Sequence, residues 1–199
     1  MDYVGLKKYN DKGQVIGEHR FVGLFTSVSY NRRPQSIPLL KHKIDAIMKK
    51  SGFDPRSHDS KALLHILETF PRDELFQMDV ESLFETSMGV LHLQERPHCK
   101  AFLRPDPFGR YVSALVFVPR EKYNSILRTK IETILCNAYN GEVSTRYAQL
   151  SNDLIARWHI IIRTQPGSVP EPDHDLLNAQ IEAVSRRWGD HLLEVLIDR

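Results

Sequence analysis

The stretch CKAFLRPDPFGRYVSALVFVP, residues 99–119, decides the fold of the C-terminal half of the chain. Cys99–Arg104 has the pattern of a strand, and the next five residues contain two prolines and a glycine, which favour a turn. Residues 111–118 are almost continuously apolar, which is typical of a central strand covered on both faces. The stretch therefore predicts a β-hairpin whose second strand ends at Pro119.

This strand–strand–helix pattern occurs twice in residues 99–199. Apolar residues at helical spacing predict an amphipathic helix over 123–138, which stops at Asn140-Gly141. A second predicted hairpin spans 143–164, with its turn at 151–153. A final helix is expected to begin at the candidate cap Asp173 and to carry its apolar stripe as far as Val195.

The resulting order, ββαββα, predicts the α+β class, with one antiparallel sheet and two helices on a single face. It is a cyclic relative of the ferredoxin-like order, so residues 98–199 look like a small ACT-like regulatory module. Trp158 and Trp188 lie on the apolar stripes of their elements. We therefore expect both rings to pack in the core rather than to form a stacking platform for a ligand.

Residues 35–97 are predicted to be a helical segment. Three apolar stripes at helical spacing begin near residues 37, 63 and 80. The candidate N-caps are Ser36 for the first helix, Ser57 or Asp59 for the second, and Asp79 for the third. We expect the three helices to pack as a small layer.

Residues 1–34 predict a β-hairpin with strands at 3–9 and 15–27 around a turn at Asn10–Gly13. The second strand is apolar on both faces, with Val22 and Leu24 on one and Phe21 and Phe25 on the other. Such a strand is normally covered on both sides. We therefore expect the hairpin to belong to a sheet whose other strands lie upstream of Met1.

The composition is that of an ordinary globular chain. The 199 residues are 41% hydrophobic and 26% charged, with a formal net charge of +2. This charge balance gives no reason to expect a nucleic-acid partner. No apolar run is long enough to span a membrane, and the first residues do not resemble a signal peptide, so we expect a cytoplasmic protein. Cys99 and Cys136 are expected to be free thiols.

The sequence contains no pattern typical of a catalytic, cofactor or metal site. Its ten glycines form neither G-x-G-x-x-G nor a P-loop, so we expect no NAD site in this chain. Ser57-His58-Asp59 has the residue types of a catalytic triad, but consecutive side chains cannot converge as a triad requires. His92, His98 and Cys99 lie on either side of Pro97 at a predicted helix end, and we expect no metal there.

The densest polar constellation surrounds the turn of the 99–119 hairpin. Its members are Lys100, Arg104, Asp106, Arg110 and Arg120, which we expect at strand ends along one edge. One interpretation is a site for an amino-acid carboxylate or for a neighbouring domain, because arginine binds carboxylates in a bidentate manner. The other interpretation is a solvated turn whose charges contribute little.

Several segments resemble the large bacterial NAD-specific glutamate dehydrogenases. The most specific is ETFPRDELFQ at residues 68–77. The others are RFVGLFTS (20–27), IPLL (37–40), SGFDP (51–55), HLQER (92–96), FGRY (108–111), VPREKY (118–123) and RWGD (187–190). The similarity extends over essentially the whole chain.

The resemblance implies a very long polypeptide with a regulatory N-terminal region of PAS-like and ACT-like modules, followed by a catalytic domain and a C-terminal domain. This chain is similar to a slice of that region: its hairpin resembles the end of a PAS-like module, and residues 98–199 resemble one ACT-like module. The resemblance also implies that the full-length enzyme uses NAD to deaminate L-glutamate oxidatively and forms a homo-oligomer.

No catalytic residue is carried over from the family, because no stretch of this chain matches its catalytic domain. We expect the chain alone to be inactive and to contact other domains of its own full-length polypeptide. The alternative expectation is that it is an effector-binding module that senses a free amino acid.

Overall fold

The computed structural model describes residues 2–24, 26–149 and 154–186. The chain divides into two compact units, residues 1–87 and 88–199. The elements of the first unit are β1 (Asp2–Tyr9), β2 (Val15–Gly23), α1 (Ser27–Asn31), the 3-10 turn η1 (Pro34–Ser36), α2 (Pro38–Ser51), α3 (His58–Thr69) and α4 (Arg72–Gln77). Helix α5 (Val80–Glu95) contains the boundary, and the second unit continues with β3 (Lys100–Pro105), β4 (Tyr111–Pro119), the 3-10 turn η2 (Arg120–Lys122), α6 (Ser125–Tyr139), β5 (Glu142–Gln149), β6 (Ile155–Arg163) and α7 (His174–Ser185).

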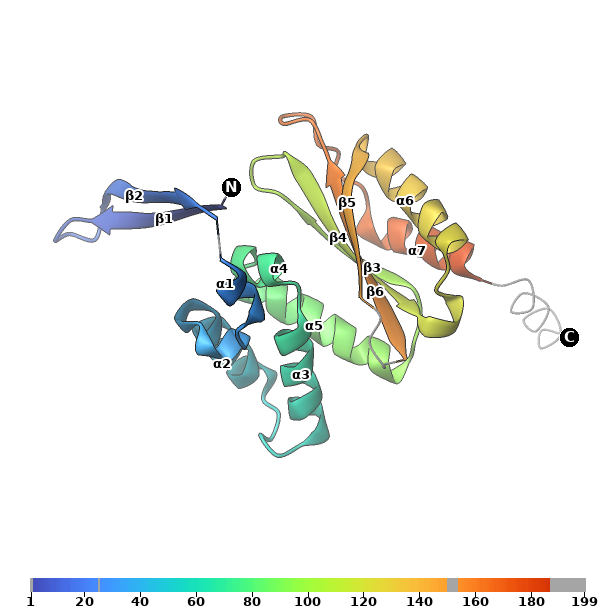
Figure 1. Ribbon diagram of the computed structural model, residues 1–199, viewed down its shortest axis with the longest axis horizontal. Coiled ribbons are helices and arrows are strands. Elements are labelled where there is room, and N and C mark those ends of the chain that lie inside the picture. Colours follow the sequence, from blue (N-terminus) through green and yellow to red (C-terminus); the bar gives the residue numbers. More distant parts are fainter. Residues whose placement is uncertain (1, 25, 150–153, 187–199) are drawn as a thin grey trace, which may run out of the picture. The chain divides into compact units, whose positions relative to one another are not determined.

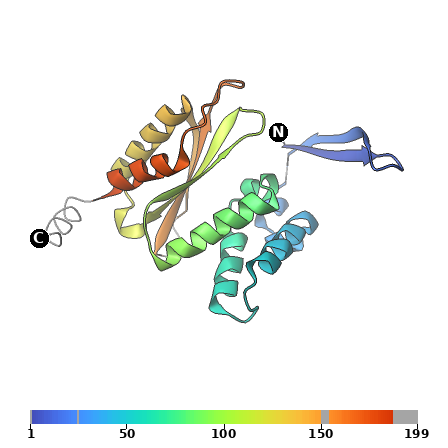
Figure 2. The same cartoon turned by 180° about the vertical axis from the view of Figure 1, so that it is seen from behind.

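The second unit is a four-stranded antiparallel sheet in the order β3-β4-β6-β5. Helices α6 and α7 lie side by side on one face of this sheet (Figure 1), and the reverse view shows them covering that face together (Figure 2). The α+β class and the ACT-like arrangement expected from the sequence are therefore confirmed.

The core of this unit lies between the sheet and the two helices. Trp158 of β6 is 2% exposed, and its ring centroid lies 4.9 Å from that of Tyr123, as the sequence predicts for a core tryptophan. The other buried side chains of this core come from the sheet and from both helices: Ala101, Val112, Ala114, Val116, Ile160 and Ile162 from the sheet, Leu127, Ile131, Leu135 and Tyr139 from α6, and Leu177 and Ile181 from α7.

Local signals set the ends of both helices. The Asn124 side chain accepts a hydrogen bond from the Leu127 N–H at the start of α6, and Asn140 ends that helix in the left-handed conformation, with φ 47°. Asp173 caps α7 as predicted, because it accepts bonds from two N–H groups of the first turn. Helix α7 spans His174–Ser185, and the rest of the predicted apolar stripe, from Trp188 to Val195, lies outside the described residues.

The C-terminal half of α5 packs on the other face of the sheet. A Cβ atom at Gly89 would lie only 2.6 Å from the ring of Phe102 in β3, so the glycine permits this close approach. The Phe102 ring in turn meets Phe117 of β4 edge to face, at 5.7 Å. Strand β4 is thus buried along most of its length, as its apolar sequence predicts.

The helical segment forms as predicted, with two differences. Ser57 caps α3 through a bond from the Ser60 N–H, and Asp79 accepts bonds from Ser82 at the start of α5. Ser36 is not the cap of α2: it lies in η1 and its hydroxyl donates to the Arg33 carbonyl, while α2 begins at Pro38, whose fixed φ suits a first helical position.

Helix α4 was not predicted from the sequence, because its six residues between Pro71 and Met78 are too few to show a helical period. Its C-terminus is held by Lys43 of α2. The Lys43 ammonium donates to the carbonyl oxygens of Leu75, Phe76 and Met78 at 2.6–2.9 Å, where the helix dipole also favours a cation. These three bonds satisfy the ammonium group of a half-buried lysine.

The N-terminal hairpin is shorter than predicted. Strand β2 ends at Gly23, which pairs with Asp2 at the start of β1, and a short helix begins at Ser27 where the sequence suggested more strand. Tyr3 donates to the Glu18 carboxylate on one face of the hairpin, and Arg20 pairs with the same carboxylate. The described apolar side chains are mostly exposed: Tyr3, Val4, Leu6, Tyr9, Val15, Ile16, Phe21, Val22 and Leu24; Phe25 lies outside the described residues.

We expect the isolated chain to self-associate through this hairpin at high concentration. Burying exposed side chains such as Phe21, Val4 and Leu6 would contribute roughly 1.5–3 kcal/mol each, and an isolated two-stranded ribbon is marginal in water. Replacing Phe21 with Lys should abolish the association in sedimentation equilibrium. A chain that stays strictly monomeric, with strongly protected Phe21 and Val22 amides, would show that the hairpin needs no cover.

Candidate functional site

The turn between β3 and β4 contains the best-ordered charged pair of the predicted constellation. The Asp106 carboxylate accepts bonds from Arg110 Nε at 2.8 Å and Nη2 at 3.0 Å, and from the backbone N–H groups of Phe108 and Arg110 at 3.2 Å. Gly109 makes the turn possible with a φ of 66°. Thr164, just after β6, closes the turn by donating to the carbonyls of Gly109 and Arg110.

The charges in this turn therefore satisfy each other. Hydrogen bonding from Arg110 holds the pKa of Asp106 below its usual value, and the same contact raises the pKa of Arg110. The carboxylate is 3% exposed, whereas the Arg110 side chain is 59% exposed and lies 5.0 Å from the Phe108 ring. This geometry favours a structural turn over a site for a ligand carboxylate, because the guanidinium fork is already occupied.

Replacing Asp106 with Asn is expected to lower the free energy of unfolding by about 1–2 kcal/mol at neutral pH, because charge-assisted bonds to a partly screened arginine are lost. The folded pKa lies below the unfolded one, so this stabilisation is present above the unfolded pKa of about 3.9 and disappears as the pH falls through the folded pKa. Urea unfolding at neutral and acidic pH measures the difference. Asp11→Asn, in the exposed hairpin turn, is the control, and an equal loss at both pH values would contradict the assignment.

The other three predicted residues lie at different places along the hairpin. Arg104 pairs with Ser113 in the β3–β4 register, near the turn, whereas Lys100 pairs with Phe117, four residues earlier on the strand and roughly 13 Å away. Arg120 follows β4 in η2, beyond the Lys100 end. The five residues are therefore divided between the two ends of the hairpin, which sequence proximity did not reveal.

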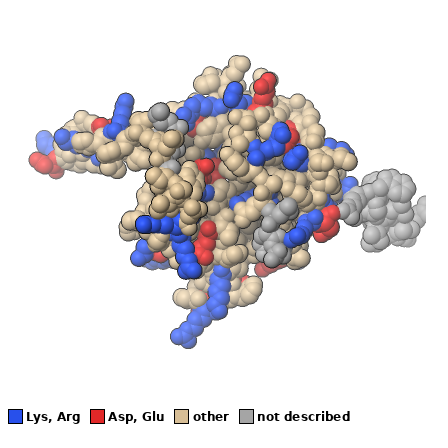
Figure 3. Space-filling model, in the orientation of Figure 1, with Lys and Arg blue, Asp and Glu red and all other residues tan. Residues whose placement is uncertain are grey.

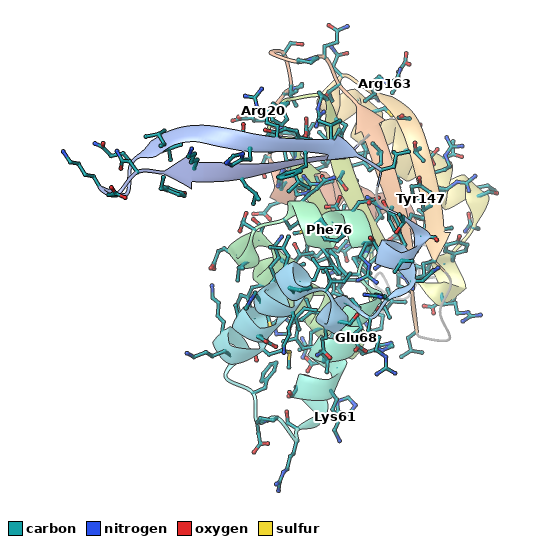
Figure 4. The ribbon with its side chains drawn as sticks, turned by 60° about the vertical axis from the view of Figure 1, so that its left-hand side comes forward. Arg20, Lys61, Glu68, Phe76, Tyr147 and Arg163 are labelled. Carbon is teal, nitrogen blue, oxygen red and sulfur yellow. The ribbon has the colours of Figure 1, made fainter. Side chains whose placement is uncertain are left out.

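A buried serine and histidine meet on the sheet face opposite α6 and α7. Ser113 Oγ lies 2.8 Å from His159 Nε2, and both residues are less than 8% exposed. The Tyr147 ring lies 6.0 Å from the imidazole, and Figure 4 shows Tyr147 projecting from β5. This pair resembles a nucleophile and its base, but it joins two central strands in a packed face, so we interpret it as a buried hydrogen bond that satisfies two polar groups.

A cation-lined cavity is the feature that the sequence reading missed. It lies at the N-terminus of α6, beside the end of α7, and has a volume of about 110 Å³. Its polar lining comes from Lys122, Asn124, Lys130, Ser185 and Arg186. A helix N-terminus and basic side chains both favour an anion. Asn124 marks the start of the helix in the sequence, but a capping residue does not by itself indicate a cavity.

Both cysteines are free thiols, as expected. Burial raises the pKa of Cys99 and of Cys136, which keeps both protonated near neutral pH and therefore poor nucleophiles. Within the described residues, no group of three His, Cys, Asp or Glu side chains could hold a metal ion.

Two further observations concern the surface and the helices. Basic and acidic side chains are interspersed on the face shown in Figure 3 rather than gathered by sign. Over the described parts of the chain, no helix is both long and apolar enough to cross a bilayer.

The sheet, its two helices and the preceding helical segment define the class of the chain: an ACT-type module joined to a helical motif. Family models agree with this class. Residues 37–96 match the model described as glutamate dehydrogenase, helical motif 1, and residues 100–189 match glutamate dehydrogenase, ACT2 domain.

Three curated relatives carry the name NAD-specific glutamate dehydrogenase. The protein of Halomonas elongata is 39% identical over 99% of this chain, and that of Pseudomonas aeruginosa is 36% identical over 99%. The protein of Mycobacterium tuberculosis is 29% identical over 96%. The chain belongs to the NAD-specific glutamate dehydrogenase family, and it spans 12% of the length of each of these relatives.

Proposed function

We propose that this chain is a non-catalytic regulatory and assembly segment of a large cytoplasmic enzyme that uses NAD to deaminate L-glutamate to 2-oxoglutarate and ammonia. The observation that carries the proposal is the match of its helices and sheet to a helical motif and an ACT domain of that family. The polar groups of the β3–β4 turn support it, because they bond to each other in a structural arrangement.

The partners in this proposal are other domains of the same polypeptide and further copies of the enzyme. The exposed apolar hairpin supports the first, since β1 and β2 present large side chains to solvent. We propose that this hairpin is the end of a PAS-like module, as the resemblance of RFVGLFTS at 20–27 suggests.

The test uses the full-length enzyme with a substitution that disturbs the ACT-type sheet without touching a catalytic domain. Gly141→Ala is suitable, because a methyl group there would meet the backbone of β6. We expect the oligomeric mass or the response to amino acids to change while the KM values for glutamate and NAD stay at wild-type level. Leu176→Ala, a 60% exposed position on α7, is the matched control. A raised KM for NAD with unchanged mass and amino-acid response would contradict the proposal.

A second candidate function is the binding of an amino-acid effector by the cation-lined cavity. Its basic side chains and the α6 N-terminus are suited to an α-carboxylate. Titration calorimetry of the chain with individual L-amino acids tests this function. Saturable heat that Lys130→Gln weakens and the exposed Lys41→Gln does not would support it, and no heat with any amino acid would contradict it.

A further inference from the structure

The outer edge of β3 is closed by a side chain from α7. Strand β3 lies at one end of the sheet order, so among the described residues no strand pairs with the outer side of its backbone. Asn178 occupies this side: its Oδ1 accepts from the Ala101 N–H at 2.8 Å, and its Nδ2 donates to the Ala101 carbonyl at 3.2 Å. One amide group thus makes both bonds that a partner strand would make to that residue.

The alternation of an antiparallel ladder extends this argument along β3. Because the N–H and C=O of Ala101 point outward, those of Leu103 and the carbonyl of Pro105 point outward as well. Pro105 has no N–H to offer. Of the three outward positions, one is therefore occupied by Asn178 and another has no donor, which leaves only Leu103 with a complete pair of backbone groups.

The presence of an asparagine inside α7 supports a role for its side chain at the strand edge. Asparagine is unfavourable inside a helix because its side chain competes for backbone hydrogen bonds, and Asn178 is the fifth residue of α7. Its Nδ2 also donates to the His174 carbonyl at 3.0 Å, which fixes the amide in position. A side-chain amide combines a donor and an acceptor in the geometry of a peptide group, so it can replace a neighbouring strand at one residue.

We propose that the Asn178 side chain, by occupying the backbone groups of Ala101, prevents β3 from pairing with β3 of a second copy. Without the Asn178 amide, the outer edge of β3 can pair with itself in a second copy. A two-fold axis at Leu103 would pair that residue with its own equivalent. The Ala101 N–H would then donate to the Pro105 carbonyl of the second copy. An unblocked strand edge is a template for such pairing. Because the Asn178 amide already occupies the N–H and C=O of Ala101, these groups cannot bond to a second β3 strand. The hydrogen bonds that remain are too few for a stable ladder between the two copies.

The experiment compares Asn178→Ala with its parent in sedimentation velocity over a range of concentrations. Both chains carry Phe21→Lys, so that the exposed hairpin does not contribute. We expect the variant to dimerise with a dissociation constant at least about tenfold lower than that of the parent, which corresponds to about 1.4 kcal/mol. Hydrogen exchange should show that a peptide over residues 99–105 becomes more protected as the dimer forms.

Two controls and one substitute variant keep the result decisive. Gln180→Ala, exposed on the same helix, should behave as the parent. Asn178→Asp keeps the acceptor and adds a charge at the edge, so it should remain monomeric; dimerisation equal to that of the alanine variant would overturn the proposal. If circular dichroism shows that Asn178→Ala is unfolded, Asn178→Gln is used as the test variant instead. Its longer side chain places the amide away from Ala101. A folded variant that stays monomeric at every concentration also overturns the proposal.

Discussion

Replacing Trp158 with Ala is expected to lower the free energy of unfolding by about 3–5 kcal/mol, the range for removing a fully buried large aromatic side chain. The ring is 2% exposed, lies between the sheet and α6, and packs against Tyr123 at 4.9 Å. Its indole N–H has no acceptor among the described residues, so the loss comes from packing and the cavity left behind. Denaturant unfolding followed by far-ultraviolet circular dichroism measures it.

Tyr147→Ala is the matched control for this prediction. Tyr147 is an aromatic residue of the same sheet, but it is 62% exposed on β5. Its removal should cost about 1 kcal/mol or less, the scale of a cross-strand contact. Equal midpoints for the Trp158 variant and wild type would show that the helices do not cover this part of the sheet.

Replacing Gly141 with Ala is expected to destabilise the chain by about 1–3 kcal/mol through overpacking. Gly141 connects α6 to β5, and a Cβ atom there would lie 2.4 Å from the Arg163 carbonyl oxygen and 2.7 Å from Ile162 Cγ2. A backbone carbonyl of β6 cannot move without disturbing the sheet, whereas a flexible side chain could. The loss therefore comes from sterics, since Gly141 does not have a positive φ.

Gly17→Ala separates this steric effect from the general effect of adding a methyl group. A Cβ at Gly17 would meet no atom within 4 Å, so the expected change is within about 0.5 kcal/mol. Denaturant midpoints of the two variants should differ clearly. If both variants unfold with the wild-type midpoint, the close contact between Gly141 and β6 is not present in solution.

The fold of the ACT-type module was predictable because its signals are local and agree with each other. The apolar run of 111–118 marked the central strand, Asn140-Gly141 marked the end of α6, and Asp173 marked the start of α7. Each of these signals acts within one turn or strand, so a single sequence contains it in full. A single antiparallel sheet with both helices on one face followed from the ββαββα pattern.

The errors arose where the structure depends on contacts between distant residues. Helix α4 is too short to show periodicity, and its stability depends on Lys43, which is about thirty residues away. Strand β2 ends at Gly23, and a short helix begins at Ser27, where the sequence predicted strand. Such information resides in the tertiary structure and not in any window of the sequence.

The candidate site was predictable only in part for the same reason. Asp106 and Arg110 lie in one turn and pair as their spacing allows, but Lys100 and Arg120 are placed by strand direction at the other end. The cavity at the start of α6 unites residues more than fifty positions apart, Lys130 and Arg186 among them. Only the folded arrangement of α6 and α7 brings these side chains together.

The most direct test of the central claim is the rate of NADH formation from NAD and L-glutamate by the purified 199-residue chain, followed by absorbance beside a full-length enzyme of the family. A non-catalytic regulatory and assembly segment is expected to give no rate above a blank without protein, while the full-length enzyme is active. A glutamate-dependent rate that rises in proportion to the concentration of the isolated chain would contradict the account.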